Sequence, residues 1–157
     1  HSYAGQVISQ VAEHVPEGTI SSIVYLDAFY LEDGQSLKDV TPPELAKLFW
    51  ENEGPGVPPP LWIAGDDGEM RDLLERKGTP HPRKTQSDRI SITGARDRVP
   101  RKTFVVATRN PANAVNPTAE RLAAAPDWEV AEIDCGHMTM IEKPRETAAI
   151  LLRAAGA

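Results

Sequence analysis

The feature that most constrains the fold of this chain is a short, nearly continuous apolar run. Ile23, Val24, Tyr25 and Leu26 follow one another inside residues 20–30. Runs of this kind, rich in β-forming side chains, are typical of strands buried on both faces, as in parallel sheets. The run therefore predicts a strand inside a mostly parallel sheet. A length of 157 residues, 40% of them apolar, suits one core with an appendage.

Helices and further strands are expected on both sides of this run. Before it, an amphipathic helix begins at Ser2, and Pro16 with Gly18 ends the pattern. After residue 102 we expect strands at residues 103–108 and 128–133 and helices at residues 117–125 and 144–155. The residues expected to be buried by the last helix are Ala148, Ala149, Leu151 and Leu152. This order predicts an α/β fold, the second half of an open, mostly parallel sheet.

Residues 31–101 have a different composition. Nine of the 14 prolines lie between Pro42 and Pro100, and residues 54–60 are expected to form no regular element. Two helices are predicted here, at residues 42–53 and at residues 66–77, the second with Asp66 at its cap. We interpret residues 31–101 as a lid inserted into a core made of residues 1–30 and 102–157. The alternative is a long insertion that only packs on the outside.

Charge and cysteine content exclude several classes of function. Seventeen Lys and Arg against 23 Asp and Glu give a net charge of −6, so we expect neither nucleic acid nor a membrane surface as a partner. Asp27 interrupts the longest apolar stretch, so the stretch is far shorter than the roughly 18–20 apolar residues that span a bilayer. The single cysteine, Cys135, can form neither an internal disulfide nor a thiolate zinc site. His14 and His81 have no partners at metal spacing, and we expect a cytoplasmic protein with no metal and no cofactor.

The opening residues His1, Ser2, Tyr3, Ala4 and Gly5 resemble the nucleophile elbow of the α/β-hydrolase superfamily, Gly-x-Ser-x-Gly on a sharp strand-to-helix turn. The first glycine would precede residue 1, Ala4 stands in place of the second, and Gly5 follows. A helix that starts at Ser2 directs its N-terminal N–H groups at the hydroxyl, and the Tyr3 N–H would be one oxyanion donor. The alternative makes Ser2 an ordinary helix cap.

A Gly-His pair near the other end of the chain is the expected partner of Ser2. Gly136 and His137 lie between the last predicted strand and the last predicted helix, where the resemblance implies that the superfamily carries its base. A serine hydroxyl is a weak nucleophile at neutral pH and needs an imidazole within hydrogen-bond distance. We therefore expect His137 to be that base, the alternative being a solvated side chain.

The acid of the triad is expected at an unusual place. The resemblance implies an acid in the loop after the strand at residues 103–108, but residues 109–114 contain no carboxylate. Asp27 ends the first strand, at the carboxyl edge where sites of open α/β sheets form, and some branches of the superfamily supply their acid there. We expect Asp27 to orient and charge-balance His137. Asn110 is the alternative orienting residue, and Asp27 could instead cap backbone N–H groups.

Further segments are similar to the bacterial branch of small esterase-like α/β-hydrolases, a branch similar to the plant methylesterase and hydroxynitrile lyase group. The segments that carry this similarity are residues 24–29, 32–36, 79–82, 99–103, 127–129 and 136–138. The resemblance implies an eight-stranded core with a helical lid after the sixth strand. This chain would then hold only the elbow helix and strands six to eight. A missing N-terminal segment or a companion chain would complete the sheet and supply the second oxyanion donor.

The predicted function is that of a serine hydrolase acting on an ester or lactone of a small, fairly apolar molecule. Ser2 would attack, His137 would transfer the proton and Asp27 would orient the imidazole. Phe49, Trp50 and Trp62 would line the substrate pocket, unless they form the lid's own core. A hydroxynitrile lyase using the same residues and a non-catalytic receptor on the same fold remain alternatives. The sequence predicts no oligomeric state.

Overall fold

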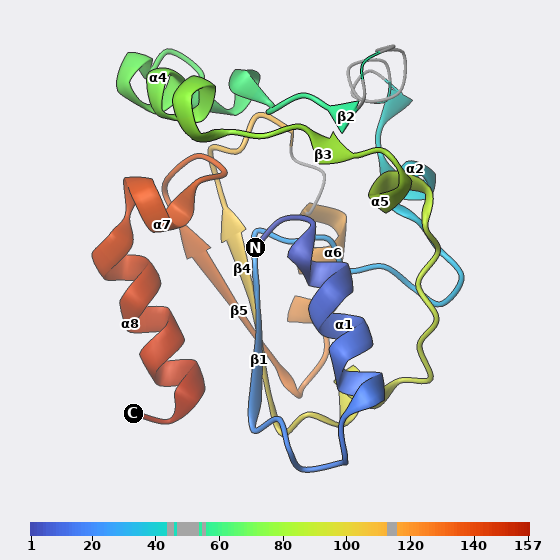
Figure 1. The fold of residues 1–157 in the computed structure, drawn as a ribbon. Helices are drawn as coiled ribbons and strands as arrows, with labels where there is room; N and C mark the ends of the chain where they lie inside the picture. Colours follow the sequence, from blue (N-terminus) through green and yellow to red (C-terminus); the bar gives the residue numbers. More distant parts are fainter. Residues whose placement is uncertain (44–45, 47–53, 55, 113–115) are drawn as a thin grey trace.

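The protein is described by a computed structural model that covers residues 1–43, 46, 54, 56–112 and 116–157 (Figure 1). Three strands form a parallel sheet in the order β1-β4-β5: β1 is Ser22–Leu26, β4 is Arg101–Ala107 and β5 is Trp128–Ile133. Leu26 pairs with Val105 and Ala107 with Ile133, so the carboxyl ends of the strands meet at one edge. The α/β class expected from the sequence is confirmed.

Helices cover both faces of the sheet, which explains why β1 is apolar on both sides. Helices α1 (Ala4–His14) and α6 (Asn116–Ala123) pack on the face where Tyr25 and Phe104 are fully buried (Figure 1). Helix α8 (Pro144–Ala155) covers the other face, where Leu26 and Val105 pack near Ile150. Neighbouring side chains of β1 therefore enter two different apolar clusters, as the alternation of a strand requires.

The terminal helix has the predicted bounds but not the predicted buried side. Its buried residues are Thr147, Ile150 and Ala154. Leu151 and Leu152 are 43% and 57% exposed, and Ala148 and Ala149 are exposed as well, so the prediction for these four residues was wrong. The buried set follows the spacing i, i+3, i+7 that places residues on one helix face. Adjacent pairs such as Leu151 and Leu152 cannot both lie on that face. Among the described residues, no helix has the length and apolarity needed to cross a membrane.

Residues 31–101 form short elements, most of which lie above the carboxyl edge of the sheet, while the last one lies beside the end of α1 (Figure 1). Among the described residues they are α2 (Leu37–Val40), β2 (Gly56–Val57), η1 (Leu61–Ala64), α4 (Gly68–Lys77), β3 (His81–Pro82), α5 (Lys84–Ser87) and η2 (Ala95–Arg98). The sequence predicted no regular element at residues 54–60, but Gly56 and Val57 pair antiparallel with β3. Such a short strand is possible because it ends before the next proline. Most of the helix predicted at residues 42–53 lies outside the described residues.

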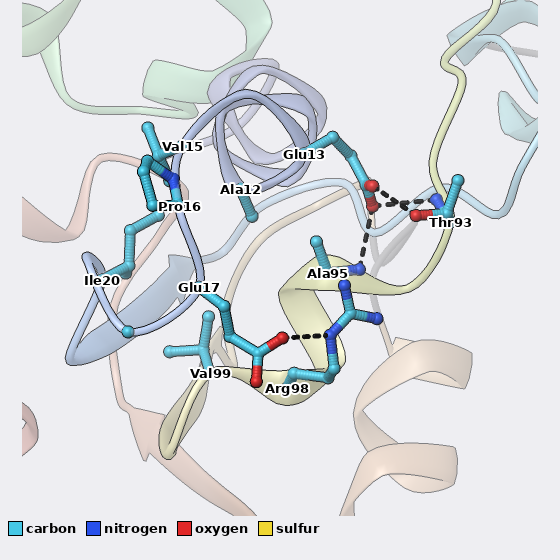
Figure 2. A pocket seen from close by; sticks show the side chains of 11 residues that line it. Ala12, Glu13, Val15, Pro16, Glu17, Ile20, Thr93, Ala95, Arg98 and Val99 are labelled. Carbon is cyan, nitrogen blue, oxygen red and sulfur yellow. Dashed lines mark hydrogen bonds and ion pairs between the residues drawn. The ribbon is translucent and has the colours of Figure 1, made fainter.

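The end of this segment is attached to α1 and to the residues after β1. Glu13 accepts hydrogen bonds from Thr93 N (2.9 Å), Thr93 Oγ1 (2.6 Å) and Ala95 N (2.9 Å), as Figure 2 shows. The Arg96 side chain is buried, donates to Leu31 O (2.6 Å) and lies 3.5 Å from the centre of the Tyr30 ring. These contacts fix the return of the chain into β4.

Candidate active site

The backbone at Ser2 has the strained geometry expected of a nucleophile elbow. Its φ is 53°, in the left-handed region that residues other than glycine seldom adopt. Ser2 N donates to Leu26 O (3.4 Å), and Phe29 N donates to Ser2 O (3.2 Å), so Ser2 lies beside the end of β1. Such strain costs about 1–3 kcal/mol and is typical of functional sites.

Gly5 provides the close approach between the first turn of α1 and the residues after β1. A Cβ at Gly5 would lie 2.0 Å from the Phe29 carbonyl oxygen and 3.1 Å from the Ala28 Cβ. No side chain fits there without moving the backbone. The small residue that the elbow needs is therefore Gly5, one position after the Ala4 that stands in the glycine position of the sequence pattern.

We expect Gly5→Ala to lower the free energy of unfolding by about 2 kcal/mol or more, because the added methyl overpacks a backbone contact. Gly68→Ala, in the first turn of α4, is the matched control, since nothing lies within 4 Å of its Cβ position. Urea unfolding of both variants measures the difference. Equal stability of the two would contradict the packing of α1 described above.

Asp27 is a buried carboxylate with hydrogen bonds on both oxygens. It follows β1, is 1% exposed and has a φ of 44°. Its Oδ1 accepts from Ala107 N (3.0 Å), and its Oδ2 accepts from Asn110 Nδ2 (2.8 Å). The same Oδ2 lies 2.6 Å from His137 Nδ1. These partners stabilise a charge that would otherwise be costly to bury.

His137 lies in the loop between β5 and α7 (Thr139–Glu142). Because Nδ1 faces Asp27, Nε2 is the nitrogen left for a reacting group, and no described residue forms a hydrogen bond with it. The His1 Nε2 lies 2.9 Å from the His137 carbonyl oxygen, and the two rings are 4.4 Å apart. Gly136 N donates to Glu142 Oε2 (2.8 Å), which holds the loop from the other side. Asn110 Nδ2 is 3.4 Å from His137 Nδ1, so Asn110 touches both members of the pair.

Ser2 and His137 line one cavity of about 340 Å³. Most of its lining is apolar, with contributions from Phe29, Leu37, Val57, Pro58, Pro59, Pro60, Ile63, Leu74 and Met138. Tyr3 lines it too, and no described residue accepts a hydrogen bond from the Tyr3 amide. The volume is within the usual range for small-molecule sites.

Of the three aromatic residues predicted to line the pocket, none is among the described lining residues. Trp62 lies in η1 beside Ile63, which does line the cavity. Phe49 and Trp50 lie outside the described residues. The sequence analysis did not predict that residues 57–60 line the cavity, because a proline-rich stretch has no periodicity that shows which side chains face inward.

A second hollow, of about 170 Å³, lies between the end of α1 and η2 (Figure 2). The Glu13 carboxylate in its wall is occupied by the hydrogen bonds described above, and Arg98 pairs with Glu17 at 3.3 Å. The charged side chains of Glu13, Glu17 and Arg98 therefore have structural partners. Within the described part of the chain, no group of three or more His, Cys, Asp or Glu side chains could hold a metal ion.

Cys135 is close to this site but is not a reactive thiol. It is fully buried, and burial, reinforced by Glu142 and Asp27, raises the pKa of its thiol to about 11. We expect no reaction of the native protein with a disulfide reagent at about pH 8, because the thiolate is the reactive form. Full reaction should follow unfolding in guanidinium. Rapid stoichiometric labelling of the native protein would contradict this assignment.

Comparisons with known proteins identify the family of this chain. A model described as the alpha/beta hydrolase family matches residues 1–150. The chain therefore belongs to the α/β-hydrolase family, as its elbow and Gly-His pair indicated. Over 161 residues it is 29% identical to the carbendazim hydrolyzing esterase of Nocardioides sp. (strain SG-4G). That alignment covers 94% of this chain and 66% of the relative, so the chain spans slightly less than two thirds of the relative's length.

Two solved structures of tomato methylketone synthase I have a similar fold. One, a variant complexed with beta-ketoheptanoate, gives a TM-score of 0.68 at 23% identity, covering 99% of this chain and 67% of that one. The other, complexed with 2-tridecanone, gives 0.67 at 22% identity, covering 99% and 69%. At these identities the likeness concerns the fold alone.

Proposed function

We propose that this protein is a serine hydrolase that cleaves the ester or lactone bond of a small, fairly apolar substrate through an acyl-enzyme. The observation that carries the proposal is the pairing of Asp27 with His137 at 2.6 Å, on a cavity that Ser2 also lines. A carboxylate, an imidazole and a strained serine at one edge of a sheet match the roles of acid, base and nucleophile. The identity to an esterase supports an ester as substrate.

Each residue has one role in the proposed reaction. The Ser2 hydroxyl attacks the carbonyl carbon while His137 Nε2 takes its proton. Asp27 keeps the Nδ1 proton of His137 in place and balances the imidazolium charge. The Tyr3 N–H stabilises the oxyanion, and such a donor is worth about 2.7–4 kcal/mol in the transition state. His137 returns the proton to the leaving alcohol, and a water then cleaves the acyl-enzyme.

We further propose that residues 31–101 act as the lid of this site. Val57, Ile63 and Leu74 come from this segment and line the cavity that Ser2 lines. The apolar wall that selects the substrate is thus built mostly by the insertion, while the reacting groups come from residues 1–30 and 102–157. Trp62, one residue before Ile63, is a candidate for contact with larger substrates.

We also propose that a further segment completes the sheet alongside β1. Among the described residues β1 forms one edge of the sheet, and its outer side has no partner strand. Val7 and Val11 on α1 are 41% and 44% exposed, an apolar pair on one helix face. Strands and helices packed there would cover both features, and a loop of that segment would supply the second oxyanion donor.

Burst kinetics of the full-length protein with p-nitrophenyl butyrate test this function. A hydrolase with a Ser2 acyl-enzyme releases a stoichiometric burst of p-nitrophenol, followed by a slower steady state. A lyase would instead release cyanide from a cyanohydrin without acylation. A receptor would bind a small apolar ester without turning it over. Either of the last two results would replace the proposal.

A further inference from the structure

His81 is a polar group in the cavity wall that the proposed reaction does not use. It lies in β3, where it pairs with Val57, and it lines the same cavity as Ser2. Its ring meets the Tyr3 ring edge-on, with centroids 4.5 Å apart and an interplanar angle of 73°. Because Tyr3 follows Ser2 directly, His81 lies close to the nucleophile on the lid side of the cavity.

Two neutral side chains hold the His81 ring in place. Its Nδ1 lies 2.8 Å from Thr85 Oγ1 and 3.0 Å from Gln86 Nε2. The carbonyl oxygen of Thr85 accepts a hydrogen bond from Gln6 Nε2 (3.2 Å), and Gln6 is a buried residue of α1. The ring is therefore connected to the elbow helix through Tyr3 and through α5, and its orientation relative to Ser2 is fixed.

The Nε2 atom of His81 is the ring nitrogen left for a ligand, because both hydrogen-bond contacts that the described residues make with the ring are on Nδ1. The Gln86 amide nitrogen can only donate, so its contact with Nδ1 favours the tautomer that carries the proton of the neutral ring on Nε2, while the Thr85 hydroxyl donates to the Pro82 carbonyl oxygen. No described residue accepts a hydrogen bond from Nε2. Burial lowers the pKa of His81, which favours the neutral ring at neutral pH. Neither Nδ1 partner is a carboxylate, so the ring lacks the charge partner that a catalytic base such as His137 has.

We propose that His81 is a specificity-determining residue whose Nε2–H binds a second carbonyl oxygen of the substrate, distinct from the scissile ester. The inference rests on the proposed function, and it narrows the substrate class to small apolar esters that carry a further carbonyl. An isolated donor in a mostly apolar wall favours such a ligand, because a substrate without the oxygen leaves the donor unpaired.

Matched pairs of activated esters test this proposal on the full-length protein. The pairs are p-nitrophenyl pentanoate with its 4-oxo derivative and p-nitrophenyl hexanoate with its 5-oxo derivative, each corrected for spontaneous hydrolysis. We expect kcat/KM to favour at least one oxo ester by about tenfold, the usual effect of one hydrogen bond. The preference should appear in KM, since this bond forms in the ground state as well as in the transition state.

Two substitutions separate hydrogen bonding from packing. His81→Phe keeps a ring against Tyr3 but removes the donor, so the oxo preference should fall at least fivefold, roughly to parity. His81→Gln places an amide nitrogen near the position of Nε2 and should keep more of the preference than Phe does. His14→Phe, at an exposed position on α1, is the control and should keep the wild-type preference.

The outcomes distinguish this inference from the function on which it rests. No preference in the wild-type protein, or an unchanged preference in His81→Phe, overturns the role of His81. If Ser2 is labelled by a fluorophosphonate but the preference is absent, only this inference fails. If Ser2 is neither labelled nor acylated, the proposed function fails and this inference fails with it.

Discussion

Replacing Ser2 by Ala is expected to lower kcat for ester hydrolysis roughly 10⁴- to 10⁶-fold. The substitution removes the atom that forms the acyl bond in the proposed reaction, while the cavity and the Asp27–His137 pair remain. Steady-state rates with p-nitrophenyl butyrate measure the loss, and thermal unfolding shows whether the fold is kept. Ser21→Ala, at an exposed position before β1, is the matched control and should retain the wild-type rate. More than a few per cent residual activity in Ser2→Ala would remove Ser2 from the mechanism.

Asp27→Asn is expected to lower kcat about 10⁴-fold, the effect of replacing the acid of a triad by its amide. An asparagine can still accept the hydrogen bond from Ala107 N through its oxygen. Its amide nitrogen, however, would donate to His137 Nδ1, and the ring proton would then lie on Nε2. A protonated Nε2 cannot accept the proton of the Ser2 hydroxyl. Steady-state kcat on the activated ester measures the loss.

The neighbouring amide provides the control for this assignment. Asn110→Ala removes one of the hydrogen bonds to Asp27 Oδ2, and we expect a loss of about tenfold, which is the scale of a charge-assisted hydrogen bond. In the double variant Asp27→Asn, Asn110→Asp the carboxylate moves to a side chain that already reaches within 3.4 Å of His137 Nδ1. The double variant should therefore be more active than Asp27→Asn alone. A larger loss in Asn110→Ala than in Asp27→Asn would make Asn110 the orienting residue.

Those parts of the fold with strong local signals could be predicted from the sequence. The strand β1 follows from an apolar run that only burial on two faces explains. Helix α8 has Pro144 in its first turn and Gly156 directly after it, and its predicted bounds match the structure. The position of Asp27 against His137 follows from chemistry, since a charge at the end of a buried strand needs a partner.

The remaining elements depend on contacts between distant residues, which a single sequence does not display. The two-residue strands β2 and β3 form only because the chain returns to the same place, some two dozen residues later. The bonds from Glu13 to Thr93 and Ala95 that fix the end of residues 31–101 join positions about 80 residues apart. Periodicity arises from regular elements, so it could not indicate that His81 faces the cavity.

Mapping the adduct of a fluorophosphonate by tandem mass spectrometry tests the central claim most directly. The account predicts a single phosphonylated residue, Ser2, and strongly reduced labelling of Asp27→Asn because His137 is then no longer oriented as a base. An adduct on another residue, or sustained ester hydrolysis by a protein in which Ser2 stays unmodified, would contradict it.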